Sequence, residues 1–131
     1  MLTAKGKTMR TMLTAALLLL TATPALAEAD WVLVSKGANG TNYFIDRSSI
    51  SITGPIRRYW ERWDFVNDPK GWKQMKLLQE ANCASGQVRT LQVSVYMVDG
   101  TNSGVTAPDQ SWQYVTPDTV GSTLHDSVCG K

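Results

Sequence analysis

The sequence predicts an exported α+β domain, in which an antiparallel β-sheet of about five to six strands carries one C-terminal α-helix on one face, with a single disulfide. Three observations predict it. Short segments of alternating apolar and polar residues are separated by turn-forming residues. One apolar stripe at helical spacing lies near the end of the chain. Two cysteines occur in a chain that begins with an export signal.

The export signal is the N-terminal stretch of residues 1–27. It starts with Lys5, Lys7 and Arg10, continues with an apolar run over 12–20, and ends in Ala25-Leu26-Ala27. A basic start, an apolar run and small residues before the cut are typical of a secretory signal peptide, so we expect cleavage after Ala27. The apolar run is shorter than the roughly 20 residues that span a bilayer. No cysteine follows the cleavage site that could carry a lipid.

Length and charge leave room for one domain, residues 28–131. The whole chain has a formal net charge of +2, and removal of the leader with its three basic residues leaves 104 residues at −1. A chain of this length can form the hydrophobic core of one domain but not of two. Neither the charge nor an exported location is typical of a nucleic-acid-binding protein.

The alternation predicts the strands in order. The expected strands are 31–35, 42–46, 49–52, 56–65, 72–83, 87–98 and 111–115, with 99–109 as a loop. Asn39-Gly40 is a turn signal that favours a hairpin between the first two strands. The strand 87–98 is the clearest of them. Strict alternation places its residues Arg89, Leu91, Val93, Val95 and Met97 on one side.

The helix is expected from Thr116 onward. Thr116 is a suitable N-cap, Pro117 suits the first helical position, and Gly130 is typical of a helix C-terminus. The apolar stripe consists of Pro117, Val120, Gly121, Leu124 and Val128.

Cys83 and Cys129 most simply pair with each other in an oxidising compartment. The alternative is a reactive thiol or a pair of metal ligands, but no other cysteine and one histidine are present to complete a metal site. The disulfide would hold the helix across the buried face of the sheet. The opposite face would then be uncovered, and a partner could approach there.

The best candidate binding residues lie on the strand 56–65. Alternation places Arg58, Trp60 and Arg62 on one side, which we assign to the open face, together with Tyr96 from the strand 87–98. The other side holds Tyr59, Glu61, Trp63 and Phe65 with Arg57, and we assign it to the core. Arginine and aromatic residues are enriched at protein interfaces. The alternative is that Trp60 lies in the core and the arginines extend outward.

No set of residues indicates catalysis, a metal site or a cofactor. His125 is the one histidine, and its neighbour Asp126 faces another direction on a helix, so we expect His125 at the surface or boundary. A metal or haem ligand is the alternative. Glu61 and Asp64 point to opposite faces of their strand. Two carboxylates that act together in catalysis would have to face each other.

Several segments together resemble one family. They are Trp31, Ile45-Asp46 with Ser49-Ile50, Arg58-Tyr59-Trp60, Glu80 before Cys83, Tyr96 before Gly100, and Pro117 before Val128-Cys129. In order and spacing they resemble the surface-adhesin protein E family of small exported bacterial domains. The resemblance implies an antiparallel sheet with a C-terminal helix, and attachment to host or matrix proteins.

These observations predict a non-catalytic exported binding domain with a protein partner. The alternative is a periplasmic carrier of a small ligand such as haem. Because no lipid-bearing cysteine is found, we expect a soluble periplasmic or secreted protein. A homodimer through the open face is the other arrangement that the sequence leaves open.

Overall fold

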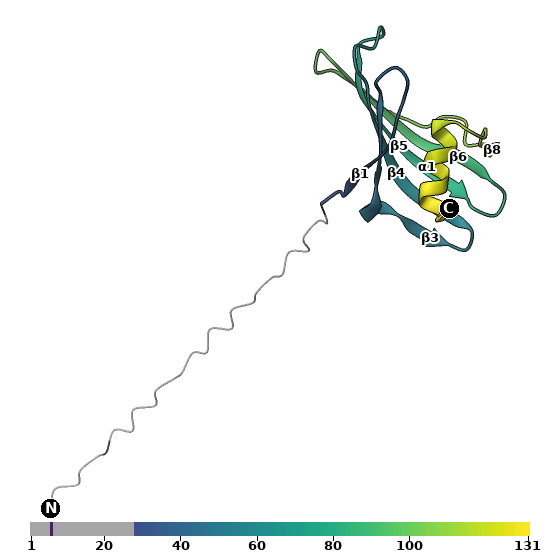
Figure 1. Cartoon of the computed structure of the whole chain (residues 1–131). Helices are drawn as coiled ribbons and strands as arrows, with labels where there is room; N and C mark the ends of the chain where they lie inside the picture. The colour runs from purple at the N-terminus through teal and green to yellow at the C-terminus, as the bar shows by residue number, and fades with distance from the viewer. Residues whose placement is uncertain (1–5, 7–27) are drawn as a thin grey trace, which may run out of the picture.

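In the computed structural model, which describes residue 6 and residues 28–131, one antiparallel sheet carries the helix α1 (Val120–Cys129) on one face (Figure 1). The fold class predicted from the sequence is therefore confirmed. The predicted signal peptide and its cleavage site lie outside the described residues. No helix among residues 28–131 is long and apolar enough to cross a membrane.

Six strands form the main path of the sheet, in the order β1-β2-β4-β5-β6-β7. They are β1 (Trp31–Lys36), β2 (Asn42–Asp46), β4 (Ile56–Asp64), β5 (Trp72–Asn82), β6 (Gln87–Met97) and β7 (Asn102–Thr106). Two short strands pair with longer strands of this path: β3 (Ser51–Thr53) pairs with β4, and β8 (Gln113–Tyr114) pairs with β6. A 3-10 turn, η1 (Arg47–Ser49), joins β2 to β3.

Both outer strands of the sheet are irregular. The pairing of β1 with β2 shifts register between Leu33 and Ser35. The pairing of β7 with β6 shifts between Ser94 and Tyr96. Gly104, in the middle of β7, has a φ of +72°, which favours glycine.

Strand β7 lies inside 99–109, where the sequence predicts a loop, so that prediction is wrong. All five residues of β7 are exposed, so no apolar alternation marks the strand in the sequence. The pairing is set instead by the tight turn before it. Asp99 accepts a hydrogen bond from the backbone N–H of Thr101 at 2.8 Å, and Met97 N–H donates to the carbonyl of Thr101 at 2.9 Å.

The predicted faces of β6 are correct for only part of the strand. Val93 pairs with Leu77 and Arg89 pairs with Glu80, and these two partners lie on opposite faces of β5. A bulge opposite Leu78 and Gln79 causes the change of face. Arg89 therefore lies on the opposite side of the sheet from Val93, contrary to the strict alternation.

The helix begins later than predicted. Thr119, not Thr116, is the N-cap, and it forms a capping box with Ser122. Asp118 has a φ of +58°, a left-handed conformation that a helix excludes, so residues 116–118 stay outside the helix. The predicted end is confirmed, since Gly130 is the left-handed C-cap with a φ of +75°.

The core lies between α1 and the sheet. Its buried members are Ile45, Tyr59, Ala81, Leu124 and Val128. The predicted disulfide between Cys83 and Cys129 is present, with a Cα–Cα distance of 5.5 Å, and it fixes the end of α1 to the end of β5. In the chain-entropy model, a bond that closes a loop of this length stabilises the fold by roughly 4 kcal/mol.

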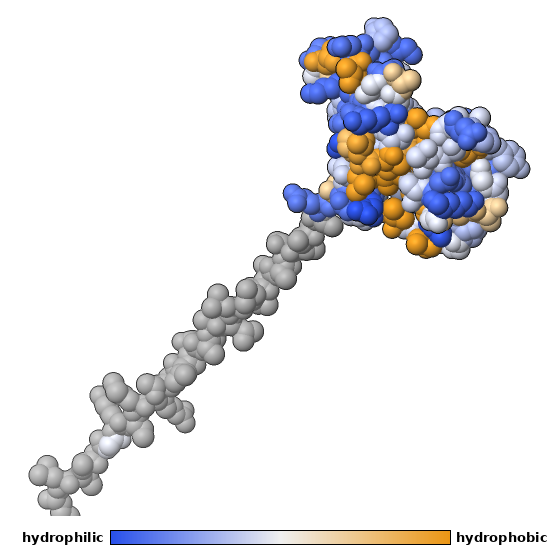
Figure 2. Space-filling model, in the orientation of Figure 1, coloured by the Kyte–Doolittle hydropathy of each residue, from blue (hydrophilic) through white to orange (hydrophobic). Residues whose placement is uncertain are grey.

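The hairpin turns extend beyond the helix as a projection from the sheet (Figure 1). Figure 2 shows apolar atoms gathered at its end and a second apolar area beside the helix. Val66 and Val98, at the turns after β4 and β6, are 55% and 69% exposed. The helix-covered side of the molecule is thus not uniformly polar.

Candidate functional site

The face opposite α1, here called the open face, is a ladder of polar and aromatic side chains on the three central strands. No helix of residues 28–131 packs on it. The strand register defines four cross-strand rows of β4, β5 and β6 residues: Arg58-Glu80-Arg89, Trp60-Leu78-Gln92, Arg62-Lys76-Ser94 and Asp64-Gln74-Tyr96. The rows contain four cationic side chains and two carboxylates, so the open face carries a surplus of two positive charges.

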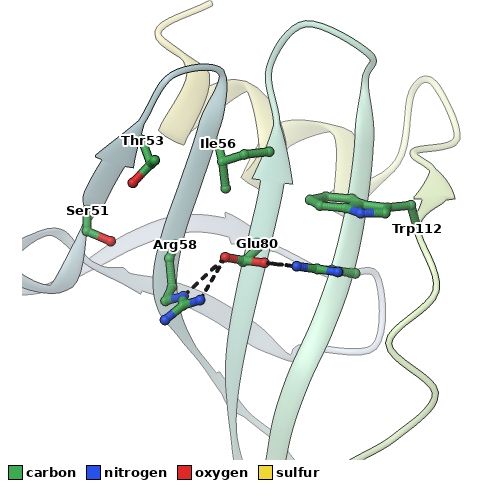
Figure 3. A pocket seen from close by; sticks show the side chains of 7 residues that line it. Ser51, Thr53, Ile56, Arg58, Glu80 and Trp112 are labelled. Atoms are coloured by element: carbon green, nitrogen blue, oxygen red, sulfur yellow. Dashed lines mark hydrogen bonds and ion pairs between the residues drawn. The ribbon is translucent and has the colours of Figure 1, made fainter.

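In the first row, two arginines hold one glutamate. Arg58 donates from Nε and Nη2 to Oε2 of Glu80, at 3.1 and 3.0 Å. Arg89 donates from Nε and Nη2 to Oε1 of the same carboxylate, at 2.9 and 2.7 Å. The Glu80 side chain is 6% exposed, whereas that of Arg58 is 54% exposed (Figure 3). The row therefore presents a net positive charge to solvent.

Glu80 is ionised in this arrangement. Burial by itself raises the pKa of the carboxyl, but the hydrogen bonds and charges of Arg89 and Arg58 outweigh burial and lower the pKa below its ordinary value. A carboxylate that accepts four charge-assisted hydrogen bonds is a fixed part of the structure. The exposed parts of the two arginines are the groups that remain for a further partner.

A shallow hollow of about 310 Å³ adjoins this row. Trp112 forms one side, with its ring 4.6 Å from the guanidinium carbon of Arg89. Ser51, Thr53 and Ile56 line the opposite side (Figure 3). The hollow thus combines an aromatic wall, two hydroxyl groups and the positively charged row. This is a chemistry suited to an acidic group carried on a larger partner.

The predicted binding residues lie on the open face but do not form one cluster. Arg58 is in the first row and Trp60, which is half-buried, is in the second. The structure thus places Trp60 outside the core. Tyr96 lies in the fourth row and two strands away, beside Lys76, whose Nζ is 5.4 Å from the ring centroid. Tyr96 is therefore separated from Arg58 by the length of the face.

Arg62 is largely engaged within the protein. Its guanidinium carbon lies 4.2 Å from the ring centroid of Phe44 and 5.0 Å from that of Trp31. Its Nε is 3.1 Å from Oδ1 of Asp64, and its side chain is 19% exposed. Arg62 contributes positive charge to the open face but offers less surface than Arg58.

His125 is buried, with 4% exposure, so the prediction of a surface or boundary position is wrong. The disulfide draws the last turn of α1 onto β5, so the ring packs against both. Its Nε2 lies 3.3 Å from the carbonyl oxygen of Asn82 and 4.0 Å from Sγ of Cys129. Nδ1 is 4.0 Å from a carboxylate oxygen of Asp126. In residues 28–131 no group of three metal-ligating side chains is found.

A second feature lies on the other face, beneath α1. A cavity of about 180 Å³ lies between the sheet and the start of the helix. The aromatic rings of Tyr43, Tyr59 and Trp63 line it, together with Glu61, which is 2% exposed. Trp63 Nε1 donates to Oε2 of Glu61 at 2.9 Å.

The environment of Glu61 differs from that of Glu80. Burial raises the pKa of Glu61 above its ordinary value, and hydrogen bonds from Trp63, Tyr59 and Gln79 only partly offset this. Burial, and then the charge of Glu61, also raise the pKa of Tyr59, so its hydroxyl stays protonated.

Sequence reasoning missed two features of these sites. It left Glu80 without a partner and did not single out Arg89 or Trp112. The partners of Glu80 come from strands 22 and 9 residues away in sequence, and only the strand register brings them together. The alternation of β4 does place Tyr59, Glu61 and Trp63 on one face. A carboxylate between two aromatic residues on the core face is therefore the pattern from which the cavity could have been predicted.

Comparison with solved structures shows the same fold in another protein. A structure of Haemophilus influenzae protein E in crystal form II has a TM-score of 0.55 and 20% identity, and the match covers 82% of this chain and 92% of that chain. A second structure of Haemophilus influenzae protein E has the same TM-score and identity, and covers 83% of this chain and 90% of that one. No curated protein matches the sequence.

The family resemblance is also confirmed directly from the sequence. Residues 31–130 match the family described as surface-adhesin protein E, which covers all the strands and the helix. This family is one of exported adhesins, and the disulfide fits an extracytoplasmic protein. The chain therefore belongs to the surface-adhesin protein E family.

Proposed function

We propose that this chain is a non-catalytic exported binding domain whose open face docks an acidic segment of a protein partner. The observation that carries the proposal is the row Arg58-Glu80-Arg89 with Trp112 beside it. Membership of an adhesin family supports a protein partner in general. The acidic character of the partner's segment and the docking surface are the parts that we propose.

The charge of the face favours an acidic partner. Glu80 neutralises one of the two arginines, and it uses Nε and Nη2 of both. The Nη1 groups remain for a carboxylate on the partner, which an arginine binds with good geometry. The expected domain, 28–131, has a net charge of −1, so the positive surplus is a property of this face and not of the whole surface.

The aromatic residues would supply most of the contact area. Trp60 lies in the row next to Arg58, and Tyr96 and Lys76 extend the surface toward the far end. Tryptophan, tyrosine and arginine are the residues most often responsible for binding energy at protein interfaces. Arg62 would act mainly through its charge, because Phe44 and Trp31 hold its guanidinium group.

The test is binding of the secreted protein to a panel of purified extracellular-matrix proteins, measured by biolayer interferometry. We expect Arg58→Ala and Trp60→Ala each to weaken binding about tenfold, which corresponds to about 1.4 kcal/mol. Arg57→Ala is the matched control. Arg57 neighbours Arg58 in β4 but faces the other side, and it donates to the carbonyl of Gly54.

Retained binding by folded Arg58→Ala and Trp60→Ala proteins would contradict the proposed surface. A different outcome is that both variants convert a dimer into a monomer in sedimentation velocity experiments. The open face would then be an interface between two copies of this chain, and docking of a different protein there would be ruled out.

A further inference from the structure

The cavity beneath α1 has the residues of a site for a small organic cation. It lies on the opposite side of the sheet from the open face, so the inference does not depend on the proposed function. Its lining includes the aromatic residues of β2 and β4, the buried Glu61, and the first turns of α1, and Gln79 of β5 and Val88 of β6 complete it. Gly121 is exposed, so the cavity reaches solvent at the start of the helix.

Aromatic rings form adjacent walls of the cavity. The centroids of Tyr43 and Trp63 are 5.3 Å apart and their planes are inclined by 68°. Tyr59, which is 1% exposed, also lines the cavity from β4, and Glu61 lies between it and Trp63 on the same face of the strand. Rings set at a large angle present their faces in different directions, and such faces attract cations through their quadrupoles.

The carboxylate in the cavity has no cationic partner within the protein. In the part of the chain from residue 28 onward, no Lys, Arg or His nitrogen lies within 4.0 Å of a Glu61 oxygen. Glu61 is nevertheless the most buried acidic residue in this part of the chain, at 2% exposure of the whole residue, compared with 5% for Glu80 and 7% for Asp46. A buried carboxyl without a cation is unfavourable as an anion, and a cation placed beside it would relieve that cost.

We infer that this cavity binds a small organic cation through a methylated ammonium head group, which lies against Tyr43, Tyr59 and Trp63 with Glu61 as its counter-ion. Aromatic faces together with a carboxylate favour such a group, because its charge is diffuse and its methyl groups are apolar. Tyr43, Trp63 and Glu61 are the residues that would recognise the charge.

The size and polarity of the cavity narrow the class of ligand. A cavity of about 150 Å³ in another protein holds benzene, so 180 Å³ is sufficient for a head group of similar size. Haem is far larger. Anions are disfavoured by Glu61, and a hard metal ion would need several more oxygen ligands than one carboxylate provides.

The experiment uses tetramethylammonium chloride as the probe and follows the indole N–H signal of Trp63 by ¹⁵N NMR. The neutral comparison is 3,3-dimethylbutan-1-ol, which has a similar shape without the charge. We expect tetramethylammonium to shift the Trp63 signal in a saturable way and to bind at least about tenfold more tightly than the alcohol.

Two pairs of variants make the test specific. Glu61→Gln should weaken binding of tetramethylammonium about tenfold and leave binding of the alcohol unchanged, whereas Asp126→Asn, which removes the same charge elsewhere, should change neither. Tyr43→Leu should weaken binding several-fold, whereas Tyr96→Leu on the open face should have no effect. The circular dichroism spectrum of each variant confirms that it is folded.

Three results would overturn the inference. The first is that tetramethylammonium does not shift the Trp63 signal at any concentration up to the high millimolar range. The second is equal affinity for the neutral alcohol, which would make this an apolar cavity only. The third is that Glu61→Gln and Asp126→Asn behave alike, or that other tryptophan signals shift in place of that of Trp63.

Discussion

Two glutamates lie on neighbouring strands, are almost equally buried, and have opposite environments. Glu80 on β5 faces the open side and accepts hydrogen bonds from two arginines. Glu61 on β4 faces the helix, and its hydrogen bonds come from the uncharged side chains of Trp63, Tyr59 and Gln79. The pKa of Glu80 is lowered and that of Glu61 is raised. Burial acts on both carboxyls in the same direction, so the neighbouring side chains decide the direction of each pKa shift.

This comparison separates a carboxylate that holds the structure together from one that is available to a ligand. Arginines on both sides of Glu80 satisfy its charge within the protein. The neighbours of Glu61 are aromatic rings and an amide, which leave its charge without a counter-ion. Variants of the two glutamates and of Trp112 test this difference.

Glu80→Gln should destabilise the protein by about 2 kcal/mol at neutral pH, because both arginines lose their charged acceptor and Arg89 is only partly exposed. Urea unfolding followed by circular dichroism measures the change. The arginines can turn toward solvent to a limited extent, which keeps the loss below that of a fully buried ion pair. A loss under about 0.5 kcal/mol would show that the row contributes little to stability.

Glu61→Gln should stabilise the protein by about 1 kcal/mol at pH near 8, because an amide keeps the acceptor for Trp63 and removes the buried charge. Urea unfolding followed by circular dichroism measures this change as well. At pH near 4, where the carboxyl is protonated in both folded and unfolded states, the gain should disappear. A variant that is destabilised at pH near 8 but not at pH near 4 would mean that the ionised form of Glu61 is the one that the fold favours.

The two glutamates should also give opposite pH dependence of stability. Because the pKa of Glu61 is raised, the folded state keeps a proton that the unfolded state has lost, and the free energy of unfolding decreases as pH rises through that window. Because the pKa of Glu80 is lowered, its contribution is present above the unfolded pKa and is lost as pH falls through the folded one. Urea midpoints of the wild type and the two Gln variants, measured across this pH range, separate the contributions.

Trp112→Ala should have the smallest effect, about 0.5 kcal/mol, because it removes one partly exposed contact with Arg89 and leaves Glu80 in place. Trp112→Phe keeps an aromatic face and should restore most of the loss in urea unfolding. Equal losses for Ala and Phe would indicate that the indole packs for another reason.

The sequence predicted what alternation and turn chemistry determine. The hairpin of β1 and β2, Gly130 at the helix end and the side of the sheet for Tyr59 and Trp60 follow from local patterns. The disulfide follows from the presence of two cysteines in an exported chain. The errors occur where the local sequence pattern is interrupted or where no apolar pattern is present. The bulge in β6 moves Arg89 to the other face, Asp118 delays the helix, and the exposed β7 has no apolar side.

The candidate sites were harder to predict because they depend on register. Arg58, Trp60 and Arg62 could be placed on one face because they alternate along a single strand. Their partners Glu80 and Arg89 could not be assigned before the pairing of β4, β5 and β6 was known. The same is true of His125, whose burial results from the disulfide that draws the last turn of α1 onto the sheet.

The irregular outer strands affect how readily the sheet can be extended by another chain. A regular outer strand presents a row of unpaired backbone groups, which is a template for pairing with a further strand and for aggregation. Here the pairing shifts at Leu33 on one border and at Ser94 on the other, and Gly104 of β7 has a left-handed backbone conformation. Both borders are therefore poor templates for strand addition, and a contact between two copies of the domain would have to form through side chains.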